Sequence, residues 1–103
     1  MCLADCYNAE SYAYDAYRDA KKAYKSSNLD RCRHYARRAK KDASYAESEA
    51  SSCNCSDAES EAYDAYRNAK KAYNSSNLDE CQSYARRAKR DASYAESEAS
   101  SCD

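Results

Sequence analysis

Small apolar residues recur along the chain in alternating steps of three and four, and polar or charged residues fill the positions between them. Such steps place the apolar positions on one face of an α-helix, whereas a half-buried strand would alternate every second residue. The four apolar series occupy residues 6–23, 29–53, 55–72 and 78–102. We therefore predict four amphipathic helices, at residues 7–25, 29–52, 56–74 and 78–101.

The pattern is an internal repeat, because residues 6–54 recur at 55–103 with a constant offset of 49. Only a few polar residues separate the two helices within each copy, so the helices of one copy must be antiparallel neighbours. The chain contains no Gly and no Pro, which leaves little to interrupt a helix. The predicted fold is all-α: two tandem helical hairpins, repeat 1 over residues 1–54 and repeat 2 over 55–103, forming an α-solenoid or a four-helix array.

Two pairs of polar residues have the spacing of a capping box at the predicted helix starts. Asn77 precedes Glu80 by three residues, and Ser56 precedes Glu59 by three. In a capping box the first side chain accepts a hydrogen bond from a backbone N–H of the first helical turn. We expect Asn77 and Ser56 to begin the last and third helices.

Ala occupies nearly every apolar position, and this choice predicts a tight but thin core. Ala lets helix backbones approach closely, yet burying one methyl group contributes only about 0.8 kcal/mol. The twelve Tyr residues flank the Ala positions. We expect Tyr to supply most of the large apolar area by packing, with hydroxyl groups at the edge, rather than to form a ligand cage.

The segment between the two helices of repeat 2 resembles a known family. Ala72-Tyr73, Leu78-Asp-Glu-Cys81, Tyr84-Ala85 and Ala88 are similar to the inter-helix region of tetratricopeptide (TPR) repeats. The similarity covers about half of each 49-residue unit, whereas TPR units have about 34 residues. The resemblance implies a TPR-like solenoid and, as one possible function, a module that binds a peptide or protein.

Overall charge and hydropathy exclude two classes of partner. Seventeen Lys and Arg nearly balance 18 Asp and Glu, so we expect no nucleic-acid binding. No apolar stretch reaches the roughly 20 residues of a membrane span, and no signal peptide is visible. The two copies differ in charge, because residues 1–54 carry ten basic and eight acidic groups and residues 55–103 carry seven and ten.

Seven cysteines in 103 residues favour an oxidising location, and we expect the protein to be extracellular or in another oxidising compartment. Antiparallel helices bring Cys6 near Cys53 and Cys55 near Cys102, which are the repeat-symmetric disulfide pairings. Counted in residues from the turn of the hairpin, Cys2 matches the position of Cys53 at least as well as Cys6 does, so the disulfide connectivity stays open. Each bond would close a loop of nearly fifty residues, worth about 4 kcal/mol in the chain-entropy model.

Cys32 and Cys81 lie at the turn end of their hairpins, without a partner in the same hairpin. We expect both to be buried thiols that act as small hydrophobic residues.

Other candidate sites are few. Asn54-Cys-Ser56 and Asn74-Ser-Ser76 fit the weak acceptor pattern for N-glycosylation. No arrangement of residues nominates a nucleophile or a general base, and we expect the carboxylates to lie on solvated faces. We predict no catalytic residues, no metal site, no cofactor and no enzymatic activity.

Three functions fit these features. The first is a structural subunit of a disulfide-stabilised, extracellular filament that self-assembles by head-to-tail stacking of repeats, since two like units leave two uncapped apolar faces. In this model Cys102 bonds to Cys2 of the next chain. The alternatives are a peptide- or protein-binding TPR-like module and a thiolate metal-storage bundle that holds a soft ion such as Cu(I).

Overall fold

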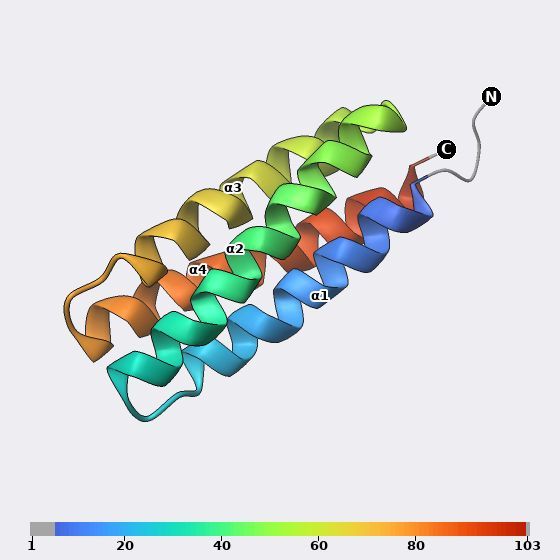
Figure 1. Ribbon diagram of the computed structural model, residues 1–103. Helices are drawn as coiled ribbons and strands as arrows, with labels where there is room; N and C mark the ends of the chain where they lie inside the picture. The colour runs from blue at the N-terminus through green and yellow to red at the C-terminus, as the bar shows by residue number, and fades with distance from the viewer. Residues whose placement is uncertain (1–5, 103) are drawn as a thin grey trace.

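The computed structural model describes residues 6–102, and four helices account for nearly all of them. The helices are α1 Tyr7–Tyr24, α2 Leu29–Ser52, α3 Ser56–Tyr73 and α4 Leu78–Ser101. The prediction of an all-α fold made of two antiparallel hairpins is confirmed (Figure 1). Helices α1 and α3 end one residue earlier than the spacing predicts, and the other bounds coincide. No helix in this part of the chain has the length and apolar character needed to cross a bilayer.

The two hairpins close on each other instead of continuing as an open solenoid. Helix α1 packs against α4 as extensively as against α2, and α3 packs against both α2 and α4. The product is an antiparallel four-helix bundle shaped as a rod of 46 × 16 × 16 Å between Cα atoms. Both interhelical turns of the hairpins lie at one end of the rod, here called the turn end (Figure 1). The α2–α3 connection, the start of α1 and the end of α4 lie at the other end, here called the open end.

The core consists of layers to which each helix contributes one small residue. Every buried apolar side chain between Cys6 and Cys102 is Ala or Cys, and nothing larger is fully buried. From the open end to the turn end the Ala layers are 9/50/58/99, 13/46/62/95, 16/43/65/92, 20/39/69/88 and 23/36/72/85. Because four methyl groups fill each layer, the helices pack closely and leave no space for a larger side chain.

Closure of the bundle removes the faces on which head-to-tail stacking depends. Ala9 and Ala13 of α1 and Ala95 and Ala99 of α4 are at most 3% exposed, because α1 and α4 pack against each other. The apolar faces predicted to be uncapped are therefore inside the molecule. Heptad spacing identifies the face of each helix that is buried but does not specify which helix covers it.

The tyrosines surround the core and do not enter it. Six of them, including Tyr12, Tyr17 and Tyr66, are half-buried, and some of these lie against the Ala layers. The others are exposed by 36% to 72%: Tyr7, Tyr14, Tyr24, Tyr45, Tyr63 and Tyr94. The prediction that Tyr packs beside the Ala positions holds for the half-buried residues only, since the separation of helices set by Ala excludes an aromatic ring from the interior.

Asn residues begin the two long helices. The Asn28 side chain accepts a hydrogen bond from the Arg31 backbone N–H at 2.8 Å, and Asn77 accepts one from Glu80 at 2.8 Å. The Glu80 carboxylate accepts from the Ser76 backbone N–H at 3.4 Å, one residue before the N-cap. The expected capping role of Asn77 is thus present.

The connection between the hairpins is a Schellman turn at Asn54. The Cys55 backbone N–H donates to the Ala50 carbonyl at 2.9 Å, and the Asn54 N–H donates to the Ser51 carbonyl at 3.2 Å. Asn54 has φ of 59°, a left-handed conformation that Asn tolerates better than most non-glycine residues. This turn makes Cys55 the N-cap of α3 and places Ser56 inside the first turn, so the prediction that Ser56 caps α3 is wrong.

Candidate functional site

Four cysteines meet at the open end of the bundle. Cys6 is bonded to Cys53 and Cys55 to Cys102, with Cα–Cα distances of 5.5 and 6.0 Å. These are the repeat-symmetric pairings, and each disulfide closes one hairpin. Cys2, the alternative partner of Cys53, lies outside the described residues. Because Cys102 is bonded to Cys55, it is not available for the bond to Cys2 of another chain that the sequence analysis considers.

The two open-end disulfides lie next to each other. The Sγ atoms of Cys6, Cys55 and Cys102 are all within 4.8 Å of one another, and Cys53 Sγ is bonded to the first of them. Cys6 and Cys55 are buried N-cap residues of α1 and α3, and Cys53 and Cys102 are half-buried C-caps of α2 and α4. Three helix ends therefore bring their sulfur atoms together, and the end of α2 adds Cys53 Sγ beside Cys6.

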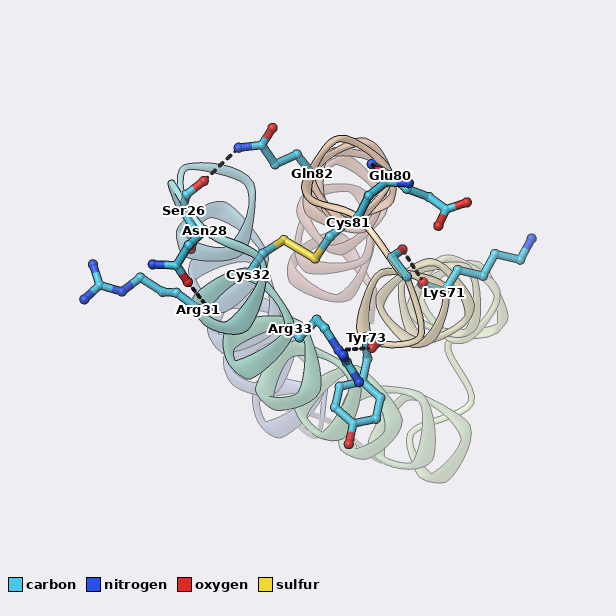
Figure 2. Close-up of a disulfide and its surroundings, with 12 residues drawn as sticks. Ser26, Asn28, Arg31, Cys32, Arg33, Lys71, Tyr73, Glu80, Cys81 and Gln82 are labelled. Carbon is cyan, nitrogen blue, oxygen red and sulfur yellow. Dashed lines mark hydrogen bonds between the residues drawn. A yellow bond between two sulfur atoms is a disulfide. The ribbon is translucent and has the colours of Figure 1, made fainter.

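The turn end carries a third disulfide, which joins the two hairpins. Cys32 of α2 is bonded to Cys81 of α4 with a Cα–Cα distance of 6.3 Å, and both residues are fully buried (Figure 2). The prediction that these residues are buried is correct, whereas the prediction that they are thiols is wrong. Each lacks a partner in its own hairpin, but bundle closure places it beside its equivalent in the other copy.

Two hydrogen bonds flank this disulfide and also cross between hairpins. Arg33 Nε donates to the Tyr73 carbonyl at 2.9 Å, and Gln82 Nε2 donates to the Ser26 carbonyl at 2.7 Å (Figure 2). Arg33 and Gln82 are equivalent residues of the two copies, 49 positions apart. Each Ala layer also contains two pairs of residues that are 49 positions apart, so the hairpins are related by an approximate twofold axis along the rod, which the Cys32–Cys81 bond crosses.

Charge is segregated along the rod rather than between the repeats. We define the turn half as residues 17–41 and 66–90 and the open half as 6–16, 42–65 and 91–102, divided at the central Ala layer. All 17 Lys and Arg of the chain lie in the turn half, where only Asp19, Asp30, Asp79 and Glu80 oppose them, a net charge of +13. The open half has no Lys or Arg and 12 carboxylates, a net charge of −12.

A groove on the turn half, which reaches Tyr14 in the adjoining open half, combines cations with aromatic rings. It measures about 570 Å³, and its lining residues include Tyr14, Tyr17, Arg18, Lys21 and Arg31. Arg18 lies over the Tyr14 ring at 5.8 Å and Lys21 over the Tyr17 ring at 5.9 Å. These cation–π contacts hold the long side chains along the helix surface.

One pair of carboxylates is packed between helices in repeat 1. Asp19 is only 7% exposed, so the prediction that the carboxylates lie on solvated faces is wrong for this residue. Burial raises the pKa of Asp42 from 3.8 to about 7, as do a hydrogen bond with Asp19 and the nearby charges of Asp19 and Asp15. Arg38 Nε, 3.6 Å from Asp19 Oδ1, opposes this increase only in part.

Repeat 2 replaces this pair with a neutral partner. Asn68 stands at the position of Asp19, and its Nδ2 donates to Asp91 Oδ2 at 2.8 Å. The pKa of Asp91 is also raised, because burial outweighs the opposing effect of the hydrogen bond from Asn68. The molecule therefore contains both a carboxyl–carboxylate pair and its amide–carboxylate counterpart in the same setting.

The two candidate glycosylation residues are both exposed at helix ends. Asn54 forms the left-handed turn between α2 and α3, and Asn74 follows the last residue of α3. Asn74 is therefore near the turn end and Asn54 at the open end. Whether either carries a glycan stays a prediction.

Comparison with protein-family models, curated proteins and solved structures finds no match for this chain. The resemblance to TPR repeats therefore stays a prediction. The function has to be argued from the geometry and charge of the rod itself.

Proposed function

We propose that this protein is a structural subunit of an extracellular assembly in which the rods associate side by side in antiparallel orientation. The observation that supports this proposal is the charge segregation, +13 in the turn half and −12 in the described open half. Antiparallel neighbours bring the basic half of each rod against the acidic half of the other. Parallel neighbours in register would instead place like charges together, which opposes association.

The dimensions favour side contacts over end contacts. One side of the rod, 46 Å long and 16 Å wide, offers about 740 Å², against about 800 Å² per partner in a standard interface. An end face of 16 × 16 Å offers only about 260 Å², which is in the range of weak crystal contacts. Lateral pairing therefore replaces head-to-tail stacking as the arrangement that we propose.

The exposed tyrosines complement this arrangement. Five of the six lie in the open half: Tyr7, Tyr14, Tyr45, Tyr63 and Tyr94. Since all Lys and Arg lie in the turn half, an antiparallel neighbour presents its cations to these rings. Intermolecular cation–π contacts contribute roughly 0.5–2 kcal/mol each, depending on how far they are desolvated.

The same surface is repeated around the rod, so association need not stop at a dimer. All four helices carry Lys or Arg in the turn half and Asp or Glu in the open half. Each side can therefore accept an antiparallel neighbour, and repeated lateral contacts build a bundle or sheet of rods. Three disulfides in a rod of four helices give each subunit the rigidity that such a material needs, and they are consistent with an oxidising compartment.

The proposal is tested by measuring self-association as a function of ionic strength. Sedimentation velocity and small-angle X-ray scattering of the oxidised protein at low salt should show dimers and larger species whose cross-section widens without a matching gain in length. Raising NaCl from 0.02 to 0.5 M shortens the Debye length to about 4 Å and should return the protein to a 46 Å rod. A monomer at high concentration in low salt would refute the proposal and favour the peptide-binding alternative.

A matched pair of variants separates charge complementarity from side-chain shape. Lys22→Glu, Arg37→Glu, Lys71→Glu and Arg86→Glu change one exposed residue on each helix, at equivalent positions of the two copies. Together they reduce the turn half from +13 to about +5 and should abolish association. The control, Lys22→Arg, Arg37→Lys, Lys71→Arg and Arg86→Lys, keeps every charge and should associate as the original chain does.

A further inference from the structure

We propose that the open-end cysteines, Cys6, Cys53, Cys55 and Cys102, form a tetrahedral zinc site when their two disulfides are reduced. This site would be independent of lateral association, because it lies at the end of the rod. The proposal combines the positions of the four sulfur atoms with the chemistry of the helix ends that carry them.

The sulfur atoms are already close to the spacing that zinc requires. A Zn–S bond of about 2.3 Å in a tetrahedron separates neighbouring sulfur atoms by about 3.8 Å. The Sγ atoms of Cys6, Cys55 and Cys102 lie within 4.8 Å of one another, and Cys53 Sγ is next to the first of them. After reduction, two sulfur atoms that were bonded move apart to van der Waals contact, which is also close to 3.8 Å. Three of the four ligands are therefore already near tetrahedral spacing, and rotation of the Cys53 side chain toward them would complete the site.

Two of the four helix ends provide donors for thiolates. Cys6 and Cys55 are the N-caps of α1 and α3, and neither helix start has a side chain hydrogen-bonded to its free backbone N–H groups. These N–H groups and the positive end of each helix dipole stabilise a negative sulfur at the N-cap position. Hydrogen bonds from outside the ligand shell hold metal-bound thiolates in orientation in the same way.

The surroundings also favour a cation over an anion. The open half contains no Lys or Arg, and Asp57 and Glu98 line a shallow cavity that reaches Cys55 and Cys102. Their negative charge attracts a divalent cation toward the sulfur atoms. The site is partly shielded from water, since Cys6 and Cys55 are 7% and 3% exposed.

The chemistry balances with a dithiol as reductant. Two dithiol molecules transfer four electrons and four protons to the two disulfides, giving four cysteine thiols and two oxidised, cyclic dithiols. One Zn²⁺ then displaces the four thiol protons and forms four Zn–S bonds, leaving a complex of net charge −2. In a reducing compartment the metal would thus hold together the same four helix ends that the disulfides join under oxidising conditions.

The test uses the full chain, reduced, cleared of metal and kept under anaerobic conditions. Titration with Co²⁺ should give the intense visible bands of a tetrahedral thiolate complex at one ion per chain, and Zn²⁺ should displace it. With Zn²⁺ bound, alkylation should spare four cysteines per chain. Absence of the tetrahedral spectrum, or alkylation of all seven cysteines with Zn²⁺ present, would overturn the proposal.

Two variants give the matched comparison. Cys55→Ser removes one ligand and should weaken Zn²⁺ binding by at least about 100-fold. Cys32→Ala with Cys81→Ala removes two cysteines at the other end of the rod and should leave Zn²⁺ stoichiometry unchanged, whereas a loss of binding in this variant would refute the assignment. If the reduced chain unfolds, circular dichroism provides the readout: Zn²⁺ should restore helicity to the original chain and not to Cys55→Ser.

Discussion

The carboxylate pair of repeat 1 predicts that the substitution Asp19→Asn will stabilise the protein at neutral and alkaline pH. Asp19 is buried and contacts Asp42, whose pKa is raised to about 7. The substitution converts the pair into the arrangement that repeat 2 already contains, in which Asn68 donates to Asp91 at 2.8 Å. It therefore removes a buried charge and supplies a donor while keeping the shape of the side chain.

The sign follows from the two protonation equilibria of Asp42. Between pH 3.8 and about 7 the unfolded chain has lost the proton and the folded chain retains it, so the free energy of unfolding falls as pH rises. Below pH 3.8 the contribution of Asp42 to the free energy of unfolding is fully present. Above about pH 7 this contribution is fully lost. Two pKa values separated by this much correspond to about 4 kcal/mol, but Asp42 is half-buried and solvent screening reduces the effect to roughly 1–2 kcal/mol.

At pH 8 the substitution Asp19→Asn should recover about 1 kcal/mol of the free energy of unfolding that the ionisation of Asp42 removes. Burial continues to raise the pKa of Asp42 in the variant, and the contact of Asp19 with Arg38 is lost. That contact is worth little, because the Arg38 side chain is 61% exposed. At pH 3 the advantage should disappear, because Asp42 is then protonated in the folded and in the unfolded chain.

Urea unfolding followed by circular dichroism at pH 3, 5, 7 and 8 measures these differences. The matched control is Asn68→Asp, which creates a second carboxylate pair and should lower stability at pH 8 by a similar amount. Other carboxylates with raised pKa, such as Glu61 and Glu96, are unchanged in both variants and cancel in the comparison. Equal stability of Asp19→Asn and the original chain at pH 8 would show that the pair carries no electrostatic cost.

Three further predictions concern the backbone and the core. Replacing Cys32 and Cys81 together by Ala opens a loop of 49 residues, which should cost about 4 kcal/mol and lower the melting temperature by about 15–20 °C in a thermal scan; a decrease below 5 °C would contradict the chain-entropy account. Asn54→Gly should stabilise the protein by a few tenths to about 1 kcal/mol, because Gly adopts a φ of 59° without strain, whereas Asn54→Val should destabilise it in the same urea assay. Ala43→Leu should cost about 1–3 kcal/mol or more through overpacking of the central layer, so an unchanged urea midpoint would mean that the helices can separate freely.

The sequence determines the helices more clearly than their arrangement. Steps of three and four, the absence of Gly and Pro, and the capping spacing at Asn77 predict each helix to within one residue of its observed bounds. These are local signals, because each depends on residues within one or two helical turns. Closure of α1 onto α4 is not local, since the same Ala faces would also suit an open stack.

The errors in the candidate sites have two origins. The Cys32–Cys81 bond depends on which helices are neighbours across the bundle. Asp19 is instead buried within its own hairpin, beside Asp42 and Arg38, at a position outside the Ala series. The charge segregation, by contrast, can be found in the sequence once each residue is assigned a position along the rod, counted from the turn end. Comparing repeat 1 with repeat 2 conceals it, because each repeat contains both a basic and an acidic half.

The approximate twofold axis through the Cys32–Cys81 bond means that one copy of the repeat contains both sides of nearly every contact between the hairpins. A separate 49-residue chain would therefore have the surface of a subunit in an isologous homodimer. Joining two such subunits through Asn54 gives the partner hairpin an effective concentration on the order of millimolar. Folding then becomes independent of protein concentration. The two copies are also free to diverge, as Asp19 and Asn68 have done, in a way that identical subunits cannot.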